Sequence, residues 1–244
     1  VSVSETDRIR RIRTMSSIAD NIGSVTRRIQ KATLKAGRSA GSVHLLAVSK
    51  TRPADELRTA YSAGQRAFGE NYVQEALDKM EELNELGAIE WHFIGPIQSN
   101  KTRDIASHFD WVHSVDRLKV ARRLSEQREP DLPPLNVCLQ VNVDDEASKS
   151  GVPLAGVAEL AEQIEALPNL RLRGLMAIPR ADNDDGNRGA FRQLAMTLSQ
   201  LRNTMPGLDT LSMGMSADYA VAIEEGATVI RLGTALFGPR PPKA

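Results

Sequence analysis

The sequence predicts a single-domain (β/α)8 barrel of the TIM type, preceded by an extra N-terminal helix. Its length of 244 residues is typical of such a barrel. Short apolar segments alternate along the chain with segments of helical periodicity, which is the pattern of parallel β/α architecture. Eight segments can be read as strands, and eight strands close a barrel. An open, doubly wound sheet is the alternative, because several of these strands are short.

The extra helix is predicted by Ile18, Ile22, Val25, Ile29 and Ala32, which recur at helical spacing and share one apolar face. The residues before it are polar, and Met15 is a candidate natural start. We therefore expect an N-terminal extension, the barrel and a short tail, at residues 1–14, 15–240 and 241–244.

The first strand is predicted by the continuous apolar run Val43-His44-Leu45-Leu46-Ala47-Val48, which suits a strand buried on both faces. Seven further segments complete the set. The predicted strands cover residues 43–48, 66–69, 90–94, 110–113, 135–142, 171–176, 208–213 and 228–232.

Four helices between these strands have recognisable apolar faces. Asp116 is the expected N-cap of one helix, and Pro153, a favoured first helical residue, is expected to start another. The four apolar faces are formed by Val73, Ala76, Leu77, Met80 and Leu83; by Leu118, Ala121 and Leu124; by Val157, Leu160, Ala161 and Ile164; and by Phe191, Leu194, Leu198 and Leu201.

Composition excludes several classes of protein. The 31 basic side chains are matched by 31 acidic ones, so no basic excess favours nucleic-acid binding. No apolar stretch approaches the length of a membrane span and the N-terminus lacks an apolar signal core, so we expect a cytoplasmic protein. Aromatic residues make up 4% of the chain, which predicts an aliphatic core. Cys138 is the only cysteine, and we expect a buried thiol.

Polar residues follow the strands at one end of the predicted barrel, where the chemistry of this fold takes place. Lys50 follows the first strand, Asn71 the second and Asn142 the fifth. A lysine at the mouth of a buried strand can have a lowered pKa and supply a neutral amine for Schiff-base formation. The alternative is that Lys50 extends into solvent, as most lysines do.

Two loops near the C-terminus match the usual phosphate position in barrels, after the seventh and eighth strands. Ser212-Met213-Gly214-Met215-Ser216 occupies one loop, and Gly233-Thr234 the other. Glycine lets backbone N–H groups approach an anion and hydroxyls add donors, although the same residues also build ordinary turns.

Arg231 interrupts an otherwise apolar strand, and a buried guanidinium needs partners. Either a structural carboxylate pairs with it, or it reaches a ligand in the barrel mouth. The sequence leaves both interpretations open.

The histidines do not indicate a metal site. His44 and His92 lie within predicted strands and are expected to be hydrogen-bonded core residues. His108 and His113 show no metal-ligand spacing with cysteines or carboxylates. Dinucleotide, P-loop and serine-hydrolase motifs are also missing from the sequence.

With these residues in view, the sequence resembles the pyridoxal-phosphate homeostasis protein family, single-domain relatives of the alanine racemase N-terminal barrel. The matching segments follow the family's order over about residues 17–240. They are Leu46–Lys50, Phe68–Glu75, Trp91–Lys101, Gln140–Asn142, Gly174–Ile178, Ser212–Ser216 and Arg231–Thr234.

The resemblance implies that pyridoxal 5′-phosphate (PLP) is held as a Schiff base on Lys50. It also implies that Ser216, Gly233 and Thr234 help to hold the phosphate, with Arg231 near the pyridine ring. No metal is implied. The full set of expected cofactor-binding residues is Lys50, Asn71, Asn142, Ser212, Ser216, Arg231, Gly233 and Thr234.

The expected function is that of a PLP carrier in vitamin B6 homeostasis, with little or no turnover. An arginine beside the ring nitrogen weakens PLP as an electron sink. The racemases that the sequence resembles use a tyrosine base from a second domain, which we do not expect here. Tyr72 and Tyr219 lie near predicted strand ends, but neither has an evident activating partner.

An amino-acid racemase-like PLP enzyme is the alternative, and an aldolase that uses Lys50 on a phosphorylated sugar is a third hypothesis. For the carrier we expect PLP itself and PLP-dependent apoenzymes as partners, and neither nucleic acid nor membrane. A monomer or weak dimer is expected.

Overall fold

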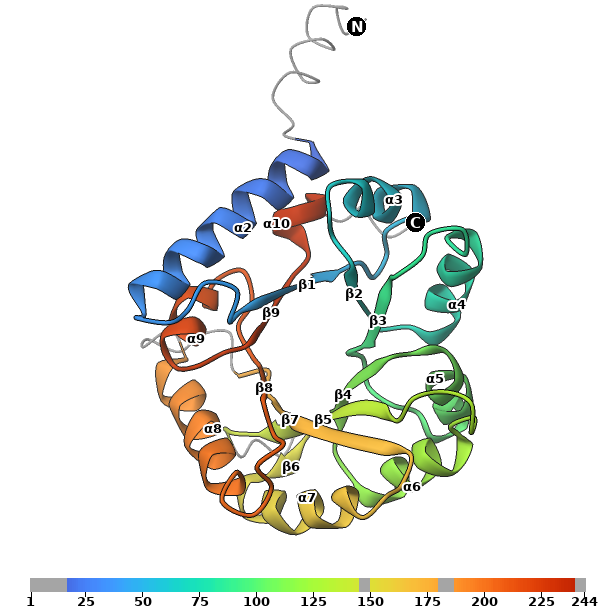
Figure 1. The fold of residues 1–244 in the computed structure, drawn as a ribbon, viewed down its shortest axis with the longest axis vertical. Coiled ribbons are helices and arrows are strands. Elements are labelled where there is room, and N and C mark those ends of the chain that lie inside the picture. The colour runs from blue at the N-terminus through green and yellow to red at the C-terminus, as the bar shows by residue number, and fades with distance from the viewer. Residues whose placement is uncertain (1–16, 145–149, 180–186, 240–244) are drawn as a thin grey trace, which may run out of the picture.

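The computed structural model describes residues 17–144, 150–179 and 187–239, which form a closed (β/α)8 barrel (Figure 1). The strands pair in parallel in the order β4-β3-β2-β1-β9-β8-β7-β5, and β4 also pairs with β5, which closes the ring. The predicted fold class is therefore confirmed, and an open sheet is excluded. The barrel strands are β1 (His44–Val48), β2 (Ala67–Glu70), β3 (Glu90–Phe93), β4 (Trp111–Val115), β5 (Leu135–Asn142), β7 (Leu170–Met176), β8 (Thr210–Ser212) and β9 (Val229–Leu232).

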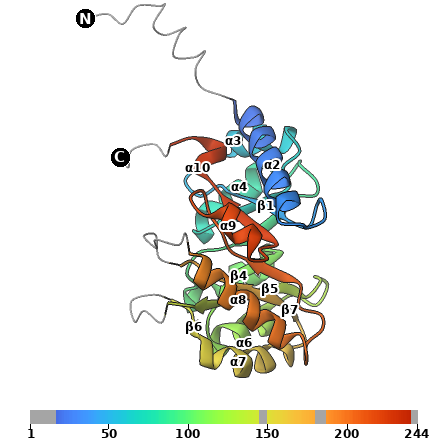
Figure 2. The same ribbon diagram turned by 90° about the vertical axis from the view of Figure 1, so that its left-hand side faces the viewer.

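The helices surround the strands as an outer layer (Figures 1 and 2). Within the described ranges, none of them is both long enough and apolar enough to cross a bilayer. They are α2 (Ile18–Lys35), α3 (Ala54–Ser62), α4 (Val73–Glu82), α5 (Thr102–His108), α6 (Leu118–Gln127), α7 (Val157–Glu165), α8 (Arg188–Leu201), α9 (Tyr219–Glu224) and α10 (Thr234–Phe237), with short 3-10 turns at Ser99–Lys101 and Leu154–Gly156.

The extra helix α2 covers the part of the barrel where the chain begins and ends its circuit. In the part of the chain that the structure describes, the last strand is followed by the four-residue α10, and α2 packs against α3, α9 and α10. It buries Ile22, Val25 and Ile29, as the spacing predicted. Ser17 and Asp20 form a capping box, in which each side chain accepts a hydrogen bond from the backbone N–H of the other.

Two predicted helix starts are wrong. Helix α7 begins at Val157 rather than at Pro153, because the chain first adds a two-residue strand, β6 (Val152–Pro153), beside the end of β5 and then makes a 3-10 turn. Asp116 is not the N-cap of α6, since Arg117 holds that position and donates its guanidinium to the Asp116 carboxylate.

The prediction that His44 is a buried core residue is also wrong. His44 is exposed, because β1 begins there, at the rim of the barrel. His92 is buried and hydrogen-bonded, as predicted. The expected extension at residues 1–14, the candidate start Met15 and the tail at 241–244 lie outside the described residues.

The space between strands and helices is filled mainly by aliphatic side chains, in agreement with the low aromatic content. A smaller cluster, Trp111, Cys138 and Met176, forms a separate patch of buried side chains. Cys138 is fully buried, as predicted, and burial raises the pKa of its thiol to about 12.

Strand β7 approaches β8 very closely at Gly174. A Cβ atom at this position would lie 1.9 Å from the backbone oxygen of Thr210, and the φ angle of 157° is one that side-chain-bearing residues rarely adopt. On the other side of β7, the register with β5 shifts between Val137 and Cys138, and Cys138 pairs with Gly174. Glycine is therefore required at this position of the barrel.

We predict that Gly174→Ala lowers the free energy of unfolding by at least about 2 kcal/mol, because β7 and β8 must separate to admit a methyl group. Urea unfolding followed by circular dichroism measures this. Gly207→Ala is the control, since a Cβ there meets no atom within 4 Å, and its effect should stay below about 0.5 kcal/mol. Equal stability of Gly174→Ala and wild type would contradict the close approach.

Candidate functional site

Six of the eight predicted cofactor-binding residues meet in one pocket at the carboxyl ends of the strands. The pocket has a volume of about 180 Å³, and Val48, Ile94, Ile178 and Met215 form its apolar walls. Its remaining lining residues are Lys50, Asn71, Ser216, Arg231, Gly233 and Thr234. Residues far apart in sequence thus converge as the barrel prediction required.

Larger hollows lie elsewhere and contain none of these residues. One of about 730 Å³ lies at the amino ends of the strands, and one of about 500 Å³ lies between α7 and α8. Pocket volume alone would therefore select a hollow that contains none of the predicted cofactor-binding residues. Ligand sites are recognised by convergent polar groups in a concave surface, and these gather at the smaller pocket.

Asn142 and Ser212 are not among the residues that line this pocket. Asn142 lies at the end of β5 and is 9% exposed, whereas Ser212 is fully buried behind Arg231. Sequence reasoning also missed the apolar walls, although Ile94 and Ile178 both lie at or just beyond the ends of predicted strands. Their positions at the carboxyl ends of strands could have identified them as pocket residues.

Arg231 lies deep in the barrel, with its guanidinium held by neutral acceptors. It donates to the Ser212 hydroxyl and to the Ala177 backbone oxygen, both at 2.9 Å, and it lines the pocket. Burial lowers the pKa of Arg231 to about 10, so the group stays cationic at neutral pH. Of the two interpretations that the sequence left open, the described contacts favour the one in which Arg231 faces a ligand.

The loop after β8 is held in shape by Asp218. Its carboxylate accepts hydrogen bonds from the Met215 backbone N–H at 2.7 Å and from the Asn187 side chain at 2.8 Å. Gly214 has a φ angle of 94°, and a Cβ there would lie 2.6 Å from the Cβ of Ala222. The glycine and the aspartate together shape the loop that carries Ser216 to the pocket.

The segment that carries Lys50 is anchored by a buried cluster of charged side chains. Lys79 of α4 is 4% exposed, and its ammonium donates to Glu70 at 2.7 Å and to the Ser49 backbone oxygen at 2.8 Å. The Ser49 hydroxyl donates to the same Glu70 oxygen at 2.6 Å. Glu75 accepts from Lys79 and from the backbone N–H of Thr51.

Lys50 therefore has anchored neighbours on both sides. Thr51 has a φ angle of 64°, a left-handed conformation that is costly for a β-branched residue and that often occurs at functional sites. Sequence reasoning missed Lys79 altogether. The available signal was the i, i+4 spacing of Glu75 and Lys79 on the helix that follows Glu70.

Glu70 is fully buried, and burial raises the pKa of its carboxyl above the ordinary value. The ion pair with Lys79 and the hydrogen bonds from Lys79 and Ser49 lower it again in part. The charge on Glu70 therefore depends on the presence of Lys79.

Asn71 offers the pocket an acceptor. Its side-chain oxygen is buried and has no hydrogen-bond partner among the described residues, so a donor group on a ligand would satisfy it. In the same ranges, no group of three or more His, Cys, Asp and Glu side chains is arranged to bind a metal ion. The pocket thus combines an amine, a cation, two hydroxyls and an open acceptor.

Comparison with known sequences gives a consistent result. A family model of the alanine racemase N-terminal domain matches residues 21–241. The pyridoxal phosphate homeostasis protein of Pseudomonas aeruginosa is 61% identical over 227 residues, covering 93% of this chain and 97% of that protein. The protein of the same name from Escherichia coli K12 is 52% identical over 229 residues, covering 93% and 98%.

Solved structures agree. PipY of Synechococcus elongatus, solved with PLP bound, is 38% identical with a TM-score of 0.78, covering 91% of this chain and 100% of PipY. Alanine racemase of Corynebacterium glutamicum is 19% identical with a TM-score of 0.66, covering 92% of this chain and 61% of the racemase. At that identity the likeness to the racemase concerns the fold alone.

We predict that Lys79→Met lowers the free energy of unfolding by about 3–5 kcal/mol, because it leaves the Glu70 carboxylate buried without its counter-charge. The pKa of Glu70 then rises further above its unfolded value of about 4.3. A raised folded pKa stabilises the fold only while the group is protonated, so the loss should be larger at about pH 8 than at about pH 5. Urea unfolding at both pH values measures it.

The double variant Lys79→Met with Glu70→Gln is the control, since it removes both charges and keeps the shape. It should recover part of the lost stability and show a smaller pH dependence than the single variant. A loss of the same size at both pH values would show that Glu70 is not the group responsible.

Proposed function

The chain belongs to the pyridoxal phosphate homeostasis protein family, and on this basis we propose that it binds PLP and acts in PLP (vitamin B6) homeostasis. The observation that carries the proposal is the meeting of Lys50, Arg231, Ser216 and Thr234 in one pocket. These side chains offer the amine, the positive charge and the hydroxyl donors that an anionic aldehyde requires.

The pocket residues fit PLP one group at a time. We assign covalent attachment to Lys50 and phosphate binding to the hydroxyls of Ser216 and Thr234 with the backbone at Gly233. The unpartnered acceptor of Asn71 would receive a hydrogen bond from the bound molecule. When bound, PLP supplies an aldehyde that forms a Schiff base with an amine.

Each residue of the site has a defined task in this proposal. The anchored neighbours of Lys50 hold its amine at the pocket, and Arg231 keeps a cation at the pocket wall. The apolar walls, among them Ile94 and Ile178, reduce contact of the site with water. Ser212 supports Arg231 from behind rather than touching the ligand.

We propose a carrier with little or no turnover rather than an enzyme. Among the described residues that line the pocket, Lys50 and Arg231 are the ionisable side chains. Two-face proton transfer needs a second base opposite the lysine. Tyr72 is 56% exposed, and neither it nor Tyr219 lines the pocket. PLP-dependent apoenzymes as recipients, a cytoplasmic location and a monomer or weak dimer complete the proposal.

Lys50→Ala is expected to abolish covalent attachment of PLP, because no other described lysine lines the pocket. After incubation with PLP and reduction with borohydride, peptide mass spectrometry should find PLP on the peptide with Lys50 in the wild type. Lys119→Ala, an exposed lysine on α6, is the control and should label like the wild type. Equal labelling of Lys50→Ala and wild type would overturn the assignment.

Ser216→Ala combined with Thr234→Val is expected to weaken PLP binding by about 10- to 100-fold, because each hydroxyl donates to a charged phosphate in the proposal. Binding of pyridoxal, which lacks the phosphate, should change by less than about threefold. Fluorescence titration with both compounds measures the ratio. Equal losses for PLP and pyridoxal would place the phosphate elsewhere.

A further inference from the structure

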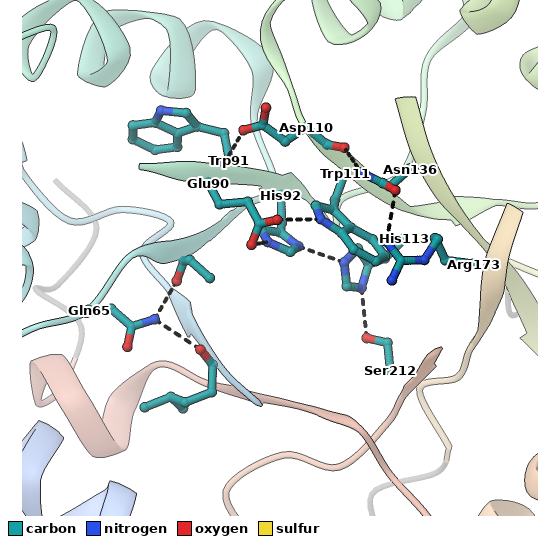
Figure 3. A network of polar contacts seen from close by, with 12 residues as sticks. Gln65, Glu90, Trp91, His92, Asp110, Trp111, His113, Asn136, Arg173 and Ser212 are labelled. Carbon is teal, nitrogen blue, oxygen red and sulfur yellow. Dashed lines mark hydrogen bonds and ion pairs between the residues drawn. The ribbon is translucent and has the colours of Figure 1, made fainter. Parts of the chain in front are cut away.

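A continuous chain of hydrogen bonds runs through the inside of the barrel. Glu90, at the amino end of β3, contacts His92 at 3.1 Å, and His92 contacts His113 at 2.9 Å. His113 contacts the Ser212 hydroxyl at 2.8 Å, and Ser212 accepts from Arg231 at 2.9 Å. Figure 3 shows the part of this chain from Glu90 to Ser212. The chain links the pocket that contains Lys50 to the hollow at the opposite mouth, which Glu90 lines.

Strand geometry explains why these side chains meet. Glu90 and His92 are two residues apart on β3, so their side chains project from the same face of the strand. His92, His113, Ser212 and Arg231 are each at most 4% exposed. Polar groups buried this deeply are hydrogen-bonded in folded proteins, and here they satisfy one another.

The two ends of the chain fix the direction of its hydrogen bonds. At one end the Arg231 guanidinium can only donate, so the Ser212 oxygen accepts. At the other end the Trp111 indole N–H donates to Glu90 at 2.7 Å. The hydrogen bond from His92 also lowers the pKa of Glu90, so this carboxylate is an acceptor with a negative charge.

Between these ends the histidines are left with one arrangement. Burial lowers the pKa of His113 well below its ordinary value, so its ring is neutral and carries one N–H. The Ser212 hydroxyl then donates to Nδ1 of His113, Nε2–H of His113 donates to Nδ1 of His92, and Nε2–H of His92 donates to Glu90. The reverse order would need either a protonated Glu90 or a doubly protonated His92, and in both cases the Ser212 hydrogen would be left without a described acceptor.

We infer that this chain is a positioning device, in which Glu90 acts through His92, His113 and Ser212 to hold Arg231 toward the ligand pocket. Glu90 fixes the protonated nitrogen of each ring, and the rings make the Ser212 hydroxyl point its hydrogen away from Arg231. The oxygen of Ser212 is thereby kept as an acceptor for the guanidinium. Glu90, His92 and His113 are positioning residues, because none of them lines the pocket of Lys50.

Glu90→Gln tests the inference. The amide oxygen must accept from the Trp111 N–H, so the amide NH2 faces His92 and donates to it. The order of the chain then reverses, and both rings should change from Nε2–H to Nδ1–H. Ring-nitrogen chemical shifts of isotope-labelled histidine report this directly in the protein without PLP. The Glu90 side chain is 48% exposed, so the variant should fold normally.

The affinity for PLP should fall about threefold to tenfold in Glu90→Gln, because Ser212 then receives two donors and holds Arg231 less well. This second readout rests on the proposed function, whereas the ring tautomers do not. Ser212→Ala separates the effect on affinity from the effect on the tautomers. It should lower PLP affinity about as much as Glu90→Gln does, but leave both rings protonated at Nε2.

Asp209→Asn is the matched control. The Asp209 carboxylate lies at the same mouth as Glu90 and pairs with Arg173, but it makes no hydrogen bond to Glu90, His92, His113, Ser212 or Arg231. It should change neither the tautomers nor the affinity. Unchanged tautomers in Glu90→Gln, or changed tautomers with wild-type PLP affinity, would overturn the inference. A wild type that fails to bind PLP at all would defeat the proposed function and leave the tautomer result intact.

Discussion

Closure of the parallel barrel is the constraint on which the rest of this structure depends. Once β9 pairs with β1, every strand of the ring runs in the same direction, and all carboxyl ends open at one mouth. Lys50, just beyond β1, and Thr234, just beyond β9, line the same pocket although most of the chain separates them. The same closure leaves an inner space that side chains must fill, and it makes single positions such as Gly174 intolerant of any side chain.

The barrel buries charge in two different ways. Beside Lys50, a compact ion pair of Glu70 and Lys79 anchors the chain segment that carries Lys50, and the charge on Glu70 depends on Lys79. Along the axis, the charges of Arg231 and Glu90 are far apart and are joined through neutral groups that each donate and accept once. Both arrangements pair buried polar atoms, although the second oxygen of Glu70 has no partner among the described residues. Only the arrangement along the axis has a direction, so a change at one end is transmitted to the other.

The sequence was informative where a local rule and the fold agree. Short, mostly apolar runs located all eight barrel strands. The ends of these runs located Lys50 and Thr234, and the interruption of one run located Arg231. The sequence was misleading where tertiary contacts override a local preference. Pro153 favours the start of a helix, but here it pairs with the end of β5 as part of a short strand. The sequence was silent about pairs such as Glu70 with Lys79, whose meeting depends on the packing of α4 against the barrel.

His92 and His113 belong to the same group of unpredicted contacts, since only the register of β3 with β4 brings the rings within reach.

The state of Cys138 has a chemical consequence for a protein that handles an aldehyde. Thiolates add readily to electrophiles and are the form that oxidants attack. The single thiol of this chain is enclosed in the barrel with a pKa of about 12, so it is protonated and shielded from both. The native protein therefore presents no competing sulfur nucleophile to its ligand. A cysteine introduced on the surface would be the one reactive thiol, and a spectroscopic probe could be attached there without removing Cys138.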